Sequence, residues 1–137
     1  MKNTTIDLLI ERAIKARINS HSPYSKFKVG AALLGESGKI FVGTNVESSS
    51  YGLTVCAERN AIAAGIVAGE KKFNSLVVIS ADGVSPCGAC RQVIYDVCGN
   101  IDVILVNKKG KIVNTVTSKE LLPFAFSGKN LKPKKEL

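Results

Sequence analysis

Two cysteine-led helix starts constrain the fold of this chain more than any other feature of its sequence. Cys56-Ala57-Glu58 opens one predicted helix, and Pro86-Cys87-Gly88-Ala89-Cys90 opens the next, with Cys56 and Cys87 separated by 31 residues. An apolar run over 75–81 predicts a strand between the two helices. A helix, a strand and a return fit this spacing, so both helix N-termini can face each other at one edge of a sheet. The sequence therefore predicts that three thiols converge at that edge.

Helical and strand patterns alternate along the rest of the chain. The expected elements are a helix from Thr4 to about Asn19, strands over 27–34 and 39–46, a helix over 54–68, a strand over 75–81, a helix over 86–98, strands over 102–107 and 111–117, and a short helix from Ser118. This order predicts an α/β fold in which helices cover one sheet. The 137 residues suffice for one domain, placed at 1–128, followed by a lysine-rich tail at 129–137.

Charge and hydropathy narrow the function classes. The net charge of +8 invites a nucleic-acid hypothesis, but four lysines gather in the tail, at positions 129, 132, 134 and 135. We therefore expect a solvated tail and no nucleic-acid partner. No apolar run approaches the ~20 residues of a membrane span, and charged residues interrupt the N-terminal apolar stretch. A cytoplasmic location without membrane contact is the expectation.

The cysteines point to metal chemistry. Without an export signal, a disulfide framework is less expected than a metal or catalytic site. Three ligands, Cys56, Cys87 and Cys90, leave the fourth tetrahedral position open, which is typical of catalytic zinc. We expect Cys98 in the core and His21, the one histidine, on the surface. Cys-x-Glu followed by Pro-Cys-x-x-Cys is the all-cysteine form of the zinc deaminase signature.

Together these motifs resemble those of the small homotetrameric cytidine deaminases. The resemblance rests on SPYSKFKVGAAL (22–33), GTNVE (43–47), CAER (56–59), SPCGACRQ (85–92) and LLPFAF (121–126). It implies a three-layer α/β fold, with a mixed five-stranded sheet and helices on both faces. It also implies one zinc ion per chain, held by Cys56, Cys87 and Cys90, and a homotetramer whose subunits share active sites.

The resemblance further implies a reaction and roles for individual residues. The reaction is hydrolytic deamination of cytidine and deoxycytidine to uridine and deoxyuridine, with release of ammonia, in pyrimidine salvage. Five residues match positions that contact substrate: Phe27 at the base, Asn45 and Glu47 at the ribose, and Tyr51 and Phe126 in a neighbouring subunit's pocket. Ser48 departs from the family, which usually has asparagine there.

The residue types explain this chemistry without the resemblance. Zinc lowers the pKa of its bound water, so that hydroxide can attack C4 of the ring. Glu58 lies two residues from a ligand and can shuttle the proton to N3 and then to the leaving amine. Because three thiolates leave the zinc site with a net charge of −1, we expect Arg59 to hydrogen-bond the thiolates and withdraw charge.

Three other functions compete with this one. A deaminase of a related cytosine nucleoside, such as blasticidin S, has the same scaffold. A nucleic-acid-binding module with structural zinc needs a fourth ligand, for which the sequence offers Cys98 or His21. A dithiol redox protein would use Cys87 and Cys90 and keep its activity without Cys56.

Overall fold

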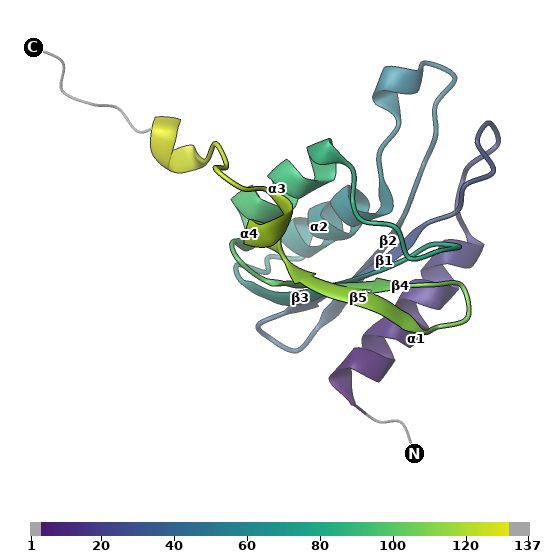
Figure 1. Ribbon diagram of the computed structural model, residues 1–137, viewed down its shortest axis with the longest axis horizontal. Coiled ribbons are helices and arrows are strands. Elements are labelled where there is room, and N and C mark those ends of the chain that lie inside the picture. The colour runs from purple at the N-terminus through teal and green to yellow at the C-terminus, as the bar shows by residue number, and fades with distance from the viewer. Residues whose placement is uncertain (1–3, 132–137) are drawn as a thin grey trace, which may run out of the picture.

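A mixed five-stranded sheet forms the middle layer of the protein (Figure 1). The computed structural model describes residues 4–131. The strands lie in the order β2-β1-β3-β4-β5, with bounds β1 Gly30–Gly35, β2 Ile40–Thr44, β3 Phe73–Ile79, β4 Asp102–Val106 and β5 Ile112–Thr117. β3 and β4 are parallel, and the other neighbouring pairs are antiparallel. The sheet predicted from the sequence is confirmed.

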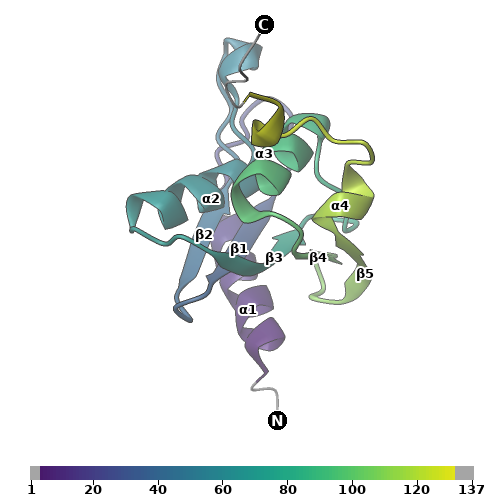
Figure 2. The same ribbon diagram turned by 90° about the vertical axis from the view of Figure 1, so that its left-hand side faces the viewer.

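Helices cover both faces of this sheet (Figure 2). Their bounds are α1 Thr5–Ile18, α2 Ala57–Val67, α3 Gly88–Cys98 and α4 Ser118–Leu121, with short 3-10 helices η1 Tyr51–Leu53 and η2 Gly128–Leu131. On one face, Leu9 and Ala13 of α1 pack against Val77 and neighbouring apolar residues. On the other, Ile62 of α2 and Ile94 of α3 belong to a second buried cluster. The predicted three layers are therefore present.

Local signals set the helix ends where the sequence predicts them. Thr4 accepts a hydrogen bond from the Asp7 N–H at 3.1 Å and caps α1, and Asn19 ends that helix. A capping box of Thr117 and Glu120 opens α4. Gly99, at φ +70°, ends α3 in the left-handed region that favours glycine.

The first strand begins three residues later than predicted. Phe27 and Val29 lie outside β1 because the Asn45 side chain takes the place of a neighbouring strand. Its Nδ2 donates to the Phe27 carbonyl at 2.7 Å, and its Oδ1 accepts from the Val29 N–H at 3.1 Å. Gly30 then starts the strand, where a Cβ would lie 2.2 Å from the Ala13 carbonyl oxygen. A glycine at that position lets α1 pack directly on β1.

The lysine-rich tail lies mostly beyond the described part of the chain. Lys129 belongs to η2, and residues 132–137 fall outside the described residues. The expectation of a solvated tail is therefore not tested. Between residues 4 and 131, the structure contains no helix with the length and apolar character that crossing a membrane requires.

Candidate active site

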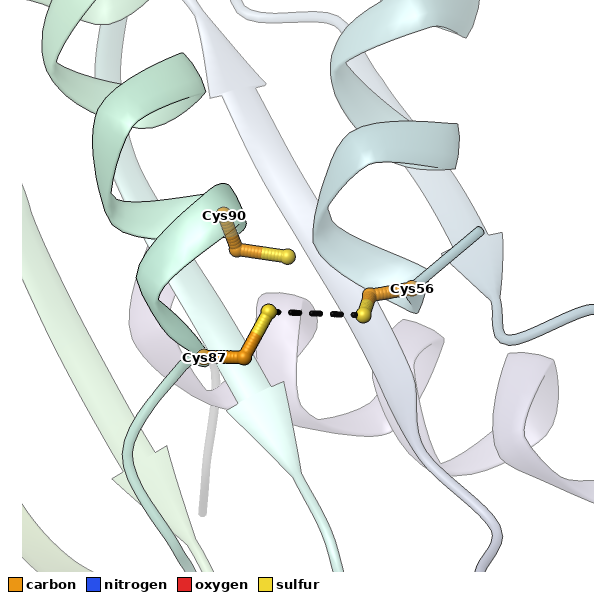
Figure 3. Close-up of side chains that lie close together, drawn as sticks. All are labelled: Cys56, Cys87 and Cys90. Atoms are coloured by element: carbon orange, nitrogen blue, oxygen red, sulfur yellow. Dashed lines mark hydrogen bonds between the residues drawn. The ribbon is translucent and has the colours of Figure 1, made fainter. Parts of the chain in front are cut away.

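Three thiols meet where α2 and α3 begin, beside the end of β3 (Figure 3). Cys56 is the residue before α2, Cys87 is the residue before α3, and Cys90 lies in the first turn of α3. The three sulfurs lie within 4.8 Å of one another, and Cys56 Sγ is 3.7 Å from Cys87 Sγ. Tetrahedral zinc with Zn–S bonds of ~2.3 Å holds its sulfur ligands about 3.8 Å apart. The cluster therefore fits zinc.

Of the three thiols, Cys56 has the environment that favours the thiolate form, while its hydrogen bond with Cys90 raises the pKa of Cys90. Cys56 and Cys87 stand at helix N-termini, where backbone dipoles stabilise negative sulfur. A hydrogen bond from Cys90 lowers the pKa of Cys56 to about 5, and the Arg59 guanidinium beside Cys56 contributes to the lowering. Arg59 Nη2 lies 3.7 Å from Cys56 Sγ. The expected contact between Arg59 and a thiolate is thus present in the structure.

Glu58 is a buried carboxylic acid beside the thiols. Its side chain belongs to the first turn of α2, and the residue is only 4% exposed. Burial raises its pKa to about 7, and the negative charge of Cys56 acts in the same direction. A carboxyl group with such a pKa can both accept and release a proton near neutral pH.

A cavity of about 330 Å³ opens in front of this group. Its wall contains the carboxylate of Glu58 together with residues from distant segments of the chain. Six of the residues predicted for the site line it: Phe27, Asn45, Glu47, Cys56, Glu58 and Cys87. The structure therefore brings the predicted base contact, the sugar contacts and two of the thiols to one cavity of nucleoside-binding size.

Of the two predicted sugar contacts, Asn45 can donate a hydrogen bond to a ligand and Glu47 can accept one. Asn45 Oδ1 already accepts from Ser20 Oγ at 2.5 Å and from the Val29 N–H, so only an N–H of its amide is left to donate. Glu47 accepts from the Tyr24 and Ser25 N–H groups and from the Ser25 hydroxyl. The Ser25 hydroxyl is the main cause of a lowered Glu47 pKa, so this carboxylate stays ionised and can only accept. A hydroxyl group can donate to a carboxylate and accept from an N–H at the same time.

Tyr51 and Phe126 do not line this cavity within a single described chain. Tyr51 is 75% exposed and packs edge-on against Tyr24, with ring centroids 6.0 Å apart. Phe126 is 57% exposed, and its carbonyl accepts a hydrogen bond from Gln92 of α3. Their predicted role in a neighbouring subunit's pocket stays a prediction.

Arg91 contributes to the site although the sequence pattern alone does not distinguish it from an exposed helix residue. Its guanidinium donates to the Pro86 carbonyl at 2.8 Å, to Ser85 Oγ at 2.8 Å and to the Leu121 carbonyl at 3.0 Å. These three bonds fix the loop that leads into Cys87. The sequence places Arg91 directly after the ligand Cys90, but its hydrogen-bond partners become visible only in the fold.

The two other candidate ligands lie away from the cluster. Cys98 packs against the core under α3, and burial raises its pKa to about 12. His21 is exposed, and its backbone bridges to Val46. Within residues 4–131, the group of potential metal ligands consists of Cys56, Cys87 and Cys90 alone. Both expectations, a core Cys98 and a surface His21, are confirmed.

Comparison with known proteins places this architecture in a family. The sequence model of the cytidine and deoxycytidylate deaminase zinc-binding region matches residues 3–115. A cytidine deaminase of Sporosarcina psychrophila is 49% identical over 129 residues, which cover 92% of this chain and 94% of that protein. The crystal structure of a cytidine deaminase from Burkholderia pseudomallei is similar with a TM-score of 0.83 and 43% identity, over 87% of this chain and 97% of the other.

The fold and the three-thiol site define a zinc-dependent hydrolytic deaminase. The chain belongs to the cytidine and deoxycytidylate deaminase family. It carries one zinc site, formed by the cluster of Cys56, Cys87 and Cys90. A blasticidin-S deaminase of Bacillus cereus is also similar, at 34% identity over 113 residues, covering 75% of this chain and 79% of that protein.

Proposed function

We propose that the protein deaminates free cytidine and deoxycytidine to uridine and deoxyuridine, with release of ammonia, in cytoplasmic pyrimidine salvage. The observation that carries the proposal is the buried carboxyl group of Glu58, which shares one cavity with two thiols of the zinc-binding cluster. The cytidine deaminase of Sporosarcina psychrophila has higher identity and coverage than the blasticidin-S deaminase of Bacillus cereus, which favours cytidine over the alternative substrate, blasticidin S.

The thiol cluster would bind zinc, and Glu58 transfers the protons. Zinc bound at the cluster would act as a Lewis acid and lower the pKa of a water molecule, so that hydroxide is available to attack C4 of the pyrimidine near neutral pH. Glu58 takes one proton from the attacking water and delivers it to N3 of the ring. It then takes the remaining proton from the hydroxyl at C4 and delivers it to the amine, which leaves as ammonia. The raised pKa of Glu58 suits both directions of transfer.

Arg59 offsets the negative charge of the three thiolates. Its guanidinium lies against Cys56, so it withdraws electron density from the ligand set. The N-termini of α2 and α3 act in the same direction. The site thereby keeps enough positive character to make the water acidic.

Asn45 and Glu47 select a free sugar hydroxyl. A hydroxyl group can donate to the Glu47 carboxylate and accept from the remaining Asn45 N–H at the same time. A phosphate on that oxygen removes its hydrogen and brings a second negative charge close to Glu47. We assign this pair to the 3′-hydroxyl, and Phe27, which is 43% exposed and lines the cavity, to the base.

This assignment predicts discrimination against 3′-phosphorylated substrates. The unaltered enzyme should turn over cytidine and deoxycytidine, cytidine 3′-phosphate little or not at all, and a cytosine-containing oligonucleotide not at all. Glu47→Gln should weaken cytidine binding and reduce the difference in kcat/KM between cytidine and cytidine 3′-phosphate. The measurement is kcat/KM for the three compounds in one buffer. Efficient turnover of the oligonucleotide would contradict the assignment and make the basic tail a candidate nucleic-acid contact.

Tyr51 and Phe126 are the residues through which we propose that a homotetramer completes its active sites. Both are aromatic, exposed and absent from the cavity of their own chain. A second subunit placed over them would remove apolar surface from water, which favours association.

Assembly and activity should therefore change together when Phe126 is truncated. Phe126→Ala should raise KM for cytidine, and dilution of the unaltered protein to monomers should abolish turnover. Phe124→Ala is the matched control, because Phe124 is an exposed phenylalanine two residues away to which the family resemblance assigns no role. Sedimentation and turnover measured over one concentration series test this. A fully active monomer would refute it.

Two competing functions lose support from the geometry. A structural zinc module needs a fourth protein ligand, and neither Cys98 nor His21 belongs to the thiol group. A dithiol redox protein would leave Cys56 and Glu58 without a role, although both adjoin Cys87 in the cavity.

A further inference from the structure

Ser25 lines the cavity and links two other residues of its wall, Glu47 and Phe27. Its hydroxyl donates to Oε2 of Glu47, and its own N–H donates to Oε1 at 3.2 Å. The same hydroxyl oxygen accepts the Phe27 N–H at 3.0 Å. Ser25 therefore contacts both the proposed sugar-binding carboxylate and the backbone of the proposed base contact.

The turn around Ser25 is held in a conformation that a non-glycine residue seldom adopts. Lys26 has a φ of +61°, in the left-handed region. Its N–H donates to the Ser22 carbonyl at 3.0 Å, which closes the turn. Such conformations persist where the surrounding contacts determine them, and here they bring the Phe27 N–H back onto Ser25 Oγ.

The hydrogen bonds to Glu47 fix the plane of its carboxylate. Oε1 accepts two backbone N–H groups, from Tyr24 and Ser25, while Oε2 accepts the Ser25 hydroxyl. Oε2 keeps acceptor capacity for one more donor. Without the hydroxyl, Oε2 has no described partner within the protein, and the carboxylate of Glu47, which lines the cavity, loses one of the three hydrogen bonds that hold it.

We propose that Ser25 is a positioning residue that orients the Glu47 carboxylate toward the 3′-hydroxyl of the nucleoside. This inference rests on the proposed function, because it assumes that Glu47 binds the sugar. It concerns binding rather than proton transfer, so its removal should act mainly on KM.

The chain contains a matched control far from the cavity. Ser37 in the turn between β1 and β2 donates its hydroxyl and its N–H to Glu70, and its oxygen accepts the Lys39 N–H. This arrangement repeats the contacts of Ser25 with Glu47 and Phe27. Ser37→Ala therefore removes the same kind of bond without touching the site.

The test compares cytidine with 3′-deoxycytidine, which lacks the hydroxyl in question. Ser25→Ala should raise KM for cytidine about tenfold, with kcat changed less than about twofold and zinc content unchanged. For 3′-deoxycytidine, KM should rise by no more than about threefold, through the Phe27 backbone alone. Ser25→Thr, which keeps the hydroxyl, should restore KM for cytidine to within about threefold. Ser37→Ala should match the unaltered enzyme with both substrates.

Each outcome bears on a different claim. If Ser25→Ala raises KM equally for cytidine and 3′-deoxycytidine, or raises it for neither, the role of Ser25 is overturned and the proposed function stays intact. A failure of Ser25→Thr to restore KM would also overturn it. Absence of cytidine turnover by the unaltered, zinc-loaded enzyme would overturn the proposed function, and this inference with it.

Discussion

Glu58→Gln is expected to lower kcat for cytidine by at least the ~10²–10⁴-fold typical of general acid–base groups, while zinc stays bound. Glutamine keeps the size and polarity of the side chain but cannot take up the proton of the attacking water. Glu58 is only 4% exposed as a residue, so no solvent base can easily replace its carboxyl group. Turnover and zinc content, measured on the same preparation, test the expectation.

A surface carboxylate provides the control for this experiment. Glu36→Gln makes the same chemical change in the exposed turn after β1 and should leave kcat within about twofold of the unaltered enzyme. Near-normal turnover by Glu58→Gln would rule out the proposed proton path. Loss of zinc from Glu58→Gln would assign Glu58 to the metal site instead.

Removing one thiol of the cluster is expected to abolish activity through loss of zinc. Cys56→Ala, Cys87→Ala and Cys90→Ala each leave two protein ligands, which are too few for a stable zinc site of this type. Cys87 is exposed, so its alanine variant should fold normally and simply lack metal. Cys90 is fully buried in the core, so its variant should also unfold at a lower temperature.

Cys98 is the matched control for the ligands. It lies on α3, eight residues beyond Cys90, and packs against the core without joining the thiol group. Cys98→Ser should keep one zinc per chain and near-normal turnover. Zinc analysis by atomic emission and thermal unfolding separate metal loss from misfolding. A metal-free Cys98→Ser, or a Cys87→Ala that retains full zinc, would contradict the ligand assignment.

The fold was predictable where local signals decide it. Residues Thr4, Gly99 and the Thr117–Glu120 pair mark helix ends through bonds within a few residues, and the structure has those ends. The start of β1 was not predictable from local pattern. Asn45 replaces a strand partner for Phe27 and Val29, and the two segments lie 16 or more residues apart in the sequence.

In the site, too, the residues in local motifs were predictable and those held by long-range contacts were not. Cys56, Glu58, Cys87 and Cys90 stand in short motifs at helix starts, so their meeting follows from the order of the elements. Ser25 and Arg91 act through bonds to residues 22 and 30 positions away, for which the sequence has no local signal.

The proposed roles of Tyr51 and Phe126 could not be predicted from the sequence pattern for a different reason. Both side chains are exposed on the single chain, and their predicted partners belong to another subunit. Only the resemblance to the family singled them out, because strand or helix periodicity assigns no role to an exposed aromatic residue. The role of these two residues in the oligomer therefore cannot be predicted from the hydrophobic periodicity or from the fold of a single chain, and the Phe126→Ala and dilution experiments test it.

The most direct test of the central claim is the conversion of cytidine by the purified, zinc-loaded protein. The ultraviolet spectrum of cytidine should change to that of uridine, with one ammonia released per uridine formed. Removal of zinc by a chelator should stop the conversion, and added zinc should restore it. No spectral change with zinc-loaded protein, or conversion that continues unchanged after zinc is removed, would contradict the account.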